Sequence, residues 1–190
     1  TVSAKRRLYP LFAPPMRSVS ALVPHPGGKM EPMTATLTST GSTAAVIVTH
    51  QRAELLRASL EQVVHQTHPV QWVIVVDNGA ENAVRELVES MAGDRGVYVP
   101  SETNLGGAGG FALGFLTALS LGADAVWCAD DDGRPADNTV LAELYRVAEA
   151  NRLHEVSPAV CNINDPDQLA FPLRQGLVWR RRMDELEGDF

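Results

Sequence analysis

Short apolar runs rich in β-branched residues alternate along the chain with segments of helical periodicity. Continuous apolar runs of this length predict strands buried on both faces, here 44–49, 72–78, 97–99 and 125–129. Apolar residues at helical spacing predict helices over 53–66, 83–91, from Phe111 to Gly122, and 138–151. A last strand is expected over 156–163. This alternation predicts an α/β fold with right-handed βαβ units and a mostly parallel sheet with helices on both faces.

The first 43 residues differ from the rest in composition. Six of the 12 prolines lie within residues 1–33, and a run rich in Ser, Thr and Gly follows them. Such a segment buries too little apolar surface to offset its ordering entropy, so residues 1–43 are predicted to be a disordered leader or an upstream extension. The folded domain is then expected over 44–190. Five basic residues precede Met33, but prolines interrupt the apolar stretch that a signal peptide needs.

Length and charge narrow the class of protein. A chain of 190 residues suits one α/β domain, and its formal charge of −7 gives no electrostatic basis for non-specific nucleic-acid binding. No stretch approaches the ~20 apolar residues that cross a bilayer. The two cysteines, Cys128 and Cys161, are expected as reduced, buried strand residues, so a zinc site is not expected. These features favour a cytoplasmic protein, with contact at the inner face of the membrane left open.

Polar residues follow each predicted strand. In an open parallel sheet, ligands bind beyond the carboxyl ends of the strands, so these residues are expected to share one edge. They are Thr49, His50 and Arg52 after the first strand, Asp77 and Asn78 after the second, 104–110 after the third, and Asp130, Asp131 and Asp132 after the fourth.

The acidic triplet Asp130, Asp131 and Asp132 is the sharpest local signal. Adjacent carboxylates repel one another, and a divalent cation relieves that repulsion. Mg²⁺ and Mn²⁺ prefer hard oxygen ligands and are often held by one or two carboxylates together with substrate phosphates. We therefore predict a Mg²⁺ or Mn²⁺ site. The alternative is an acidic turn in which one aspartate caps the next helix and the others face water.

The glycine-rich stretch NLGGAGGFALG begins at Asn104. Its glycines allow a backbone to approach a ligand closely, but a dinucleotide fingerprint belongs after the first strand and this loop follows the third. Helix packing against the sheet explains Gly109, Ala112 and Gly114 about as well as a ligand does. Asn104 and Gly106 are harder to explain by packing.

Three other positions leave two interpretations open. Asp77 suits hydrogen bonds to a base or ribose, or the capping of the next turn. Arg52 suits a base or a phosphate, or a solvated helix start. Trp179 and the arginines at 180–182 suit an anion or a membrane surface, or a solvated charge run.

Taken in order, the stretches VIVTHQR, VIVVDNGAEN, NLGGAGGFALG and ADDDG resemble the nucleotide-sugar-binding half of family 2 glycosyltransferases with the GT-A fold. More narrowly, NLGGAGGFALGF, WCADDDG, EVSPAVCNINDP and AFPLRQGLVWRRR resemble the mycobacterial-type galactofuranosyltransferases that initiate cell-wall galactan synthesis. The resemblance covers about residue 45 to the end of the chain.

The resemblance implies an inverting enzyme with UDP-galactofuranose as donor and a polyprenyl-diphosphate-linked rhamnosyl-N-acetylglucosamine as acceptor. It further implies that the uridine and ribose are bordered by four residues: Thr49, Arg52, Asp77 and Asn104. The donor-binding set as a whole also includes Asn78, Gly106, Asp130 and Asp131. Asp130 and Asp132 would hold the metal ion on the diphosphate, as the DXD motif of the family. The ion would offset charge that develops on the departing UDP.

An inverting transferase also needs a general base, which removes the proton from the attacking hydroxyl. The acidic residues that follow the triplet do not match the family's base motif: Asp165, Asp167, Asp184, Glu185, Glu187 and Asp189. The base is therefore expected beyond Phe190, and the domain is expected to be incomplete at its C-terminus. Alternatives are a family 2 transferase of other sugar specificity, such as a rhamnosyltransferase, and a non-catalytic nucleotide-sugar-binding module. A nucleotidyltransferase is disfavoured because the first strand is not followed by a glycine loop.

Overall fold

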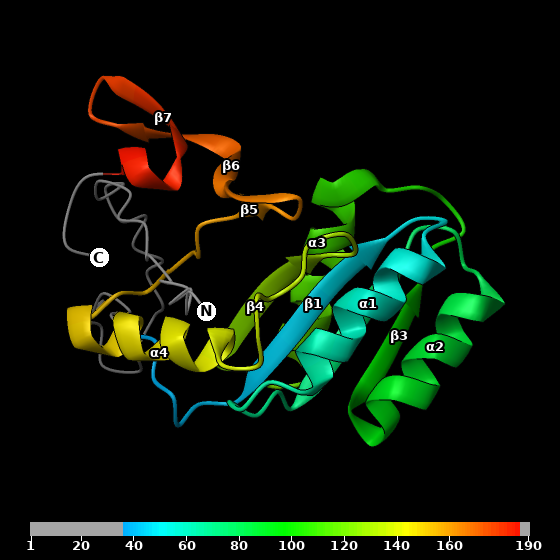
Figure 1. Ribbon diagram of the computed structural model, residues 1–190. Coiled ribbons are helices and arrows are strands. Elements are labelled where there is room, and N and C mark those ends of the chain that lie inside the picture. The colour runs from blue at the N-terminus through cyan, green and yellow to red at the C-terminus, as the bar shows by residue number, and fades with distance from the viewer. Residues whose placement is uncertain (1–35, 187–190) are drawn as a thin grey trace, which may run out of the picture. The chain divides into compact units, whose positions relative to one another are not determined.

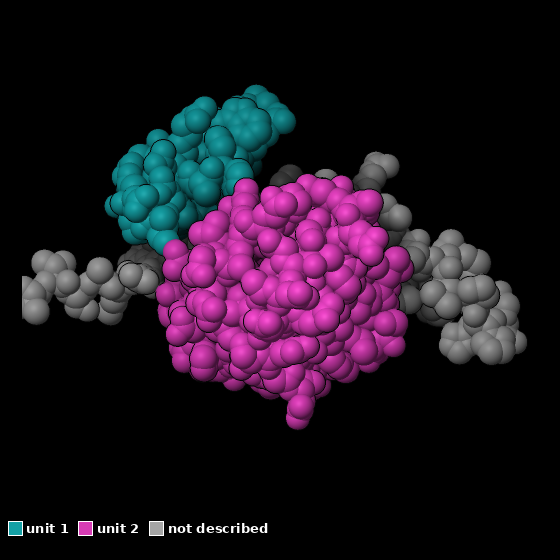
Figure 2. All heavy atoms as spheres, turned by 90° about the vertical axis from the view of Figure 1, so that its right-hand side faces the viewer, with its two compact units in different colours: residues 1–36, 147–190 teal, residues 37–146 magenta. Residues whose placement is uncertain are grey.

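A computed structural model describes residues 36–186, which fall into two compact units (Figures 1 and 2). The predicted leader lies outside these residues, except for 36–43. The larger unit, Leu37–Arg146, contains the strands and helices of the predicted α/β domain. In chain order these are β1 (Thr43–Thr49), α1 (Ala53–Val64), β2 (Trp72–Asp77), α2 (Asn82–Ala92), a 3₁₀ turn (Gly93–Arg95), β3 (Gly96–Pro100), α3 (Gly106–Ser120), β4 (Ala125–Asp130) and the first half of α4 (Val140–Asn151).

The four strands form one parallel sheet in the order β3-β2-β1-β4. Runs such as AAVIVT and WVIVV sit in its two central strands because both faces of those strands are covered. The parallel sheet and its flanking helices confirm the predicted α/β class. Seven predicted elements agree with the structure to within two residues at each end, and the third helix begins five residues earlier than the expected Phe111.

Each face of the sheet has its own apolar core. On one face Ala45, Ile47, Val73 and Val75 pack with α1, α2 and the start of α4. On the other face Ala44, Val46, Ile74 and Val76 pack with α3. In Figure 1, α1 and α2 lie in front of the sheet and α3 lies behind it.

Glycines let α3 lie directly on β1. A Cβ atom added to Gly114 would lie 2.3 Å from Cγ1 of Val46, and one added to Gly110 would lie 2.5 Å from Cγ1 of Val48. The packing interpretation of this stretch therefore applies to Gly114, and Gly110 shares that role. Ala112 is exposed, so the packing interpretation does not apply to it.

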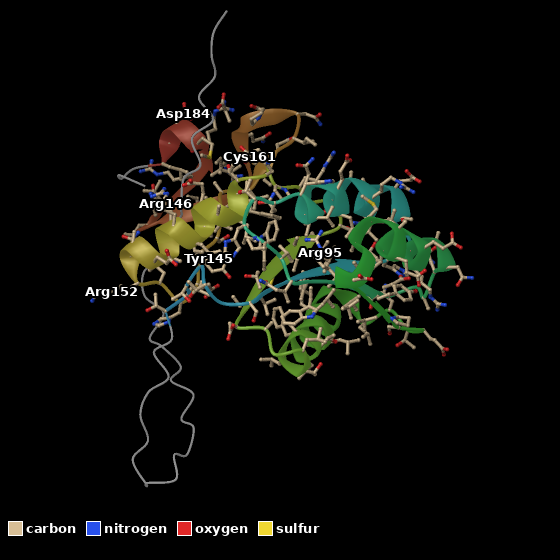
Figure 3. The ribbon with its side chains drawn as sticks, turned by 90° about the horizontal axis from the view of Figure 1, so that it is seen from below. Arg95, Tyr145, Arg146, Arg152, Cys161 and Asp184 are labelled. Carbon is tan, nitrogen blue, oxygen red and sulfur yellow. The ribbon has the colours of Figure 1, made fainter. Side chains whose placement is uncertain are left out.

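Polar contacts tie α4 and the β3 region to the core. The hydroxyl of Tyr145, labelled on α4 in Figure 3, lies 2.6 Å from Oγ1 of Thr43, and its ring stacks on that of His68. Arg95, also labelled there, donates to the carbonyl oxygens of Val70 and Val64. These bonds occupy polar groups that would otherwise be buried without partners.

The smaller unit contains the second half of α4 and a ribbon of antiparallel strands: β5 (Cys161–Asn162), β6 (Asp165–Gln175) and β7 (Val178–Arg182), followed by a 3₁₀ turn (Met183–Glu185). The strand predicted over 156–163 is therefore wrong for most of its length: β5 covers Cys161–Asn162 alone, and it pairs antiparallel with β6. Apolar composition suggested a strand over this segment, but periodicity identifies neither the residues that pair nor their partner strand.

The two cysteines also differ from expectation. Cys128 is exposed on β4 and Cys161 is half-buried, so neither is the buried strand residue that was predicted. Apolar neighbours in the sequence suggested burial, but β4 is an edge strand of the described sheet and has one open face.

Candidate functional site

The carboxyl ends of the strands adjoin one another, as the parallel arrangement requires. Thr49 at the end of β1 is the register partner of Asp77 on β2, and Val48 is the partner of Asp130 on β4. A backbone hydrogen bond extends the pairing of β1 and β2 by one residue: the amide of Asn78 donates to the carbonyl oxygen of Thr49 over 2.9 Å. Residues that sequence reasoning assigned to one sheet edge are thus neighbours in the structure.

The acidic loop after β4 is anchored through its middle residue. Asp131 is buried, and its Oδ2 accepts a hydrogen bond of 2.8 Å from the hydroxyl of Thr49. The guanidinium of Arg52 lies 3.4 Å from Oδ1 of Asp131 and 3.3 Å from Oδ2 of Asp132. The side chain of Asp132 is 57% exposed. Asp131 therefore fixes the loop, while Asp132 stays accessible to a ligand.

Ser59 of α1 holds the backbone of the same loop. Its hydroxyl lies 2.9 Å from the carbonyl oxygen of Gly133 and 3.2 Å from that of Asp130. Sequence reasoning missed this residue. The available signal was a serine on the apolar stripe of a helix, because a fully buried hydroxyl there requires a partner.

The acidic loop carries more negative charge than its neighbours balance. Burial raises the pKa of Asp130, and the charges of Asp132 and Asp131 raise it further. Among the described residues, only Arg52 forms an ion pair with the triplet. A carboxyl group in such surroundings favours either a proton or a cation.

A divalent cation fits the donor set of this loop. No group of three His, Cys, Asp or Glu side chains is assembled for a metal within residues 36–186. Two carboxylates, Asp130 and Asp132, flank the anchored Asp131 and offer hard oxygen atoms. That number suffices for Mg²⁺ or Mn²⁺ when substrate phosphates complete the coordination. The metal assignment itself stays a prediction.

The carboxylate of Asp77 is occupied within the protein. The residue is fully buried; its Oδ1 accepts from the amide of Gly79 at 2.9 Å, and its Oδ2 accepts from the amide of Glu81 at 2.6 Å. The hydroxyl of Tyr98 donates to the same Oδ2 at 2.9 Å. Of the two interpretations of Asp77, the structure shows the capped turn, and contact with a nucleotide stays a prediction.

Tyr98 is a second residue that sequence reasoning missed, since it lies in the weakly patterned third strand. Burial, the hydrogen bond to Asp77 and the charge of that carboxylate raise the pKa of Tyr98 to about 12. The guanidinium of Arg85 lies 5.2 Å from the centre of its ring. The phenol therefore remains a hydrogen-bond donor to Asp77 at neutral pH.

Asn78 connects the end of β2 to the glycine-rich loop. The residue is buried, its Oδ1 accepts from the amide of Leu105, and its Nδ2 donates to the carbonyl oxygen of Gly106, both over 3.3 Å. Nδ1 of His50 donates to the backbone oxygen of Asn78 over 3.1 Å. Within the loop, Oδ1 of Asn104 accepts from the amide of Gly106 at 2.8 Å.

Gly106 itself has φ +66° and no atom within 4 Å of the position where a Cβ would lie. The left-handed backbone favours glycine there, and the open space leaves the loop accessible. Through Asn78, the loop after β3 therefore lies at the same sheet edge as Thr49 and Asp77.

Trp179 and the arginines at 180–182 are not part of this edge in the larger unit. They belong to β7 in the smaller unit.

The family model described as Glycosyl transferase family 2 matches residues 44–189. The galactofuranosyltransferase GlfT1 of Mycolicibacterium smegmatis is 56% identical over 153 residues, which are 80% of this chain and 50% of that protein. GlfT1 of Mycobacterium tuberculosis is 56% identical over 149 residues, 77% of this chain and 49% of that protein. The chain thus spans about half the length of the curated relatives it matches.

Two solved structures resemble part of the chain. Staphylococcus aureus TarS 1–349 in complex with UDP has a TM-score of 0.48 and 18% identity, covering 57% of this chain and 32% of that one. The mannosyltransferase PcManGT from Pyrobaculum calidifontis, in complex with GDP-Man and Mn²⁺, has a TM-score of 0.44 and 19% identity, covering 69% of this chain and 35% of that one.

Proposed function

The chain belongs to glycosyl transferase family 2, and from this premise we propose that its protein transfers galactofuranose from UDP-galactofuranose to a lipid-linked acceptor. The acceptor we propose is a polyprenyl-diphosphate-linked rhamnosyl-N-acetylglucosamine, and the transfer inverts the anomeric carbon. The observation that carries the proposal is the 56% identity to two galactofuranosyltransferases over about four fifths of the chain.

In this proposal the donor lies across the strand ends. Thr49, Arg52 and Asp77 border its uridine and ribose, and Asn104 completes that border. Asn78 and Gly106 hold the loop beside it, with Gly106 offering open backbone. Asp130 and Asp131 lie next to the donor, Asp131 by fixing the acidic loop through Thr49.

Asp130 and Asp132 would hold Mg²⁺ or Mn²⁺ on the diphosphate. The bound ion supplies positive charge that offsets the charge developing on the leaving UDP. Arg52 would add positive charge beside the diphosphate, because its guanidinium already lies within 3.4 Å of the acidic loop and its side chain is about half exposed. A general base beyond Phe190 stays a prediction.

The acceptor carries a polyprenyl chain, so we propose that the enzyme works at the inner face of the cell membrane as a peripheral protein. Trp179 and the arginines at 180–182 support such a contact, since Trp179 is 60% exposed beside basic side chains. Among the described residues, no helix combines the length and apolar character that crossing a bilayer requires.

The test is direct transfer. The protein is incubated with UDP-galactofuranose, Mn²⁺ and the synthetic lipid-linked disaccharide, and the products are read by mass spectrometry. One added hexose is expected from UDP-galactofuranose and none from UDP-glucose. Transfer from another donor would favour different sugar specificity. Binding of UDP without transfer in the complete protein would favour a nucleotide-sugar-binding module.

A further inference from the structure

The hydroxyl group of Ser59 reaches both ends of the acidic turn. Strand β4 ends at Asp130, and the amide of Gly133 donates back to the carbonyl oxygen of Asp130 over 3.2 Å, which closes a β-turn. The Ser59 hydroxyl lies 3.2 Å from the same oxygen and 2.9 Å from the carbonyl oxygen of Gly133. One side chain of α1 therefore ties together the first and last residues of the turn that carries Asp130 and Asp132, the two predicted metal ligands.

These bonds are not the usual ones for a serine inside a helix. Such a hydroxyl often bonds to the carbonyl group four residues earlier in its own helix. Ser59 instead contacts groups 71 and 74 positions away in the sequence. It is fully buried, and so are its apolar neighbours on the helix stripe, Leu56, Leu60 and Val63. Alanine would favour the helix more at such a position, so the hydroxyl serves the acidic turn rather than α1 itself.

Helix α1 holds the same turn at a second point. The guanidinium of Arg52, the residue that caps α1, lies 3.4 Å from Oδ1 of Asp131 and 3.3 Å from Oδ2 of Asp132. Ser59 follows Arg52 by about two helical turns, so both lie on the same side of α1. The Arg52 ion pairs are partly exposed and can be exchanged for contacts with a ligand, whereas the buried Ser59 bonds stay in place.

We propose that Ser59 is a positioning residue for the metal ion. By fixing the two ends of the turn, its hydroxyl holds Asp130 and Asp132 in the arrangement that binds Mg²⁺ or Mn²⁺ beside the diphosphate of UDP. The inference rests on the metal-assisted donor binding of the proposed function. Groups that orient metal ligands change the metal affinity by about 10–100-fold when they are removed.

The choice of cation separates this role from a general contribution to stability. Mg²⁺ requires a strict octahedral arrangement of its ligands, whereas Ca²⁺ accepts a flexible one. A turn that has lost its tie should therefore lose affinity for Mg²⁺ more than for Ca²⁺. A hydroxyl that merely satisfied the core would, when removed, lower the melting temperature and leave the preference between the two ions unchanged.

The experiment measures metal binding by the UDP-loaded protein. Electron paramagnetic resonance of free Mn²⁺ gives the Mn²⁺ affinity, with UDP alone as the blank, and displacement of bound Mn²⁺ gives the affinities for Mg²⁺ and Ca²⁺. In Ser59→Ala we expect the affinities for Mn²⁺ and Mg²⁺ to fall about tenfold, and that for Ca²⁺ to fall less than about threefold. Calorimetry in EDTA is expected to give the same metal-free UDP affinity as wild type.

Three variants control for packing and stability. Ser59→Thr keeps the hydroxyl and is expected to keep the preference for Mg²⁺ over Ca²⁺. Ser59→Cys fills nearly the same space with a weak donor, so it should lose that preference as Ser59→Ala does. Val63→Ala opens a cavity one turn further along α1, at a residue that is also fully buried. It should lower the melting temperature and leave the preference unchanged.

Three results would overturn the inference. The first is an unchanged preference for Mg²⁺ over Ca²⁺ in both Ser59→Ala and Ser59→Cys. The second is an equal loss of preference in Val63→Ala, which would assign the effect to stability alone. The third is an absence of Mn²⁺ uptake by the UDP-loaded wild type, which would remove the metal assignment as well. None of these readouts depends on transfer of galactofuranose, so a failure of the transfer assay would be recognised separately.

Discussion

The two halves of the ligand edge differ in how far folding completes them. At the β2–β3 end, Asp77 receives three hydrogen bonds and Asn78 holds the glycine-rich loop with two. At the β1–β4 end, Asp131 and Asp132 share the guanidinium of Arg52, no described ion pair reaches Asp130, and Asp132 is open to solvent. The first half is a preformed frame in which the side chains of Asp77 and Asn78 already have partners. The second is short of positive charge, which a bound ligand can supply.

The largest effect is expected on the free energy of unfolding, when the frame at the β2–β3 end loses Asp77. Asp77→Ala removes the acceptor of two backbone amides and of the Tyr98 hydroxyl, and leaving such buried donors unpaired costs about 3 kcal/mol in total. Urea unfolding followed by circular dichroism measures the loss. Asp77→Asn keeps one acceptor oxygen and should cost clearly less. Equal stability of wild type and Asp77→Ala would show that this end is not a preformed frame.

The opposite end should respond in binding rather than in stability. Asp130→Asn with Asp132→Asn removes two charges from a loop that carries an excess of them, so stability is expected to hold or rise slightly. Affinity for UDP in the presence of Mn²⁺ should fall about 100-fold, or ~2.8 kcal/mol. Isothermal calorimetry with and without Mn²⁺ provides the measurement. Unchanged Mn²⁺-dependent affinity in the double variant would remove the metal assignment.

Packing beneath the frame gives the third prediction. In Gly114→Ala the new methyl group would lie 2.3 Å from Val46, so the variant is expected to lose about 2 kcal/mol through overpacking. Gly107→Ala is the control, because no atom lies within 4 Å of its Cβ position. That change should be neutral or stabilise α3 by up to ~1 kcal/mol. Denaturant midpoints of the two variants should therefore move in opposite directions or differ clearly.

Thr49 lies where the two ends meet, and its loss should be modest. Thr49→Val keeps the shape of the side chain but removes the 2.8 Å hydrogen bond to Asp131, at a cost of about 1 kcal/mol. The freed acidic loop should also bind UDP more weakly. Thr49→Ser restores the hydroxyl and should restore both properties. Loss of affinity in Thr49→Ser but not in Thr49→Val would point to the methyl group instead.

The smallest expected effect is the dependence of stability on the ionisation of Tyr98 at high pH. Folded Tyr98 keeps its proton to a pKa of about 12, whereas an ordinary tyrosine releases it near 10.0. The unfolded chain therefore binds fewer protons between these values, so the stability from this group is complete below pH 10 and declines as the pH rises towards 12. Spectrophotometric titration of tyrosinate should show one late group that is absent in Tyr98→Phe. Asp77→Asn should lower this pKa.

Much of the fold was predictable because its central strands are buried on both faces. Such strands appear in the sequence as continuous β-branched runs, and the helices between them carry clear apolar stripes. The family match and the parallel sheet together confirm the predicted fold class. Prediction failed over most of 156–163, where β5 spans only Cys161–Asn162 and pairs antiparallel with β6. Local pattern does not specify which residues of such a segment find a partner strand, so the predicted strand was too long.

The site was predictable in location more than in detail. The rule for parallel sheets brought Thr49, Asp77 and the acidic triplet to one edge, and the register agrees. The sequence could not show that Asp131 turns inward or that Asp77 caps a turn, since both depend on which donors the folded chain brings near. Ser59 and Tyr98 were missed because their partners, Gly133 and Asp77, lie 74 and 21 positions away in sequence.

The glycines that let α3 lie on β1 also weaken α3 as a helix. Five of them occur between Gly106 and Gly114, and each lowers helix stability by roughly 1 kcal/mol relative to alanine. The N-terminal half of α3 is thus held by its contacts with Val46 and Val48 rather than by its own propensity. Its amides should exchange with deuterium through local opening well before those of α1 or α2. The loop that Asn78 holds is therefore expected to open more readily than α1 and α2.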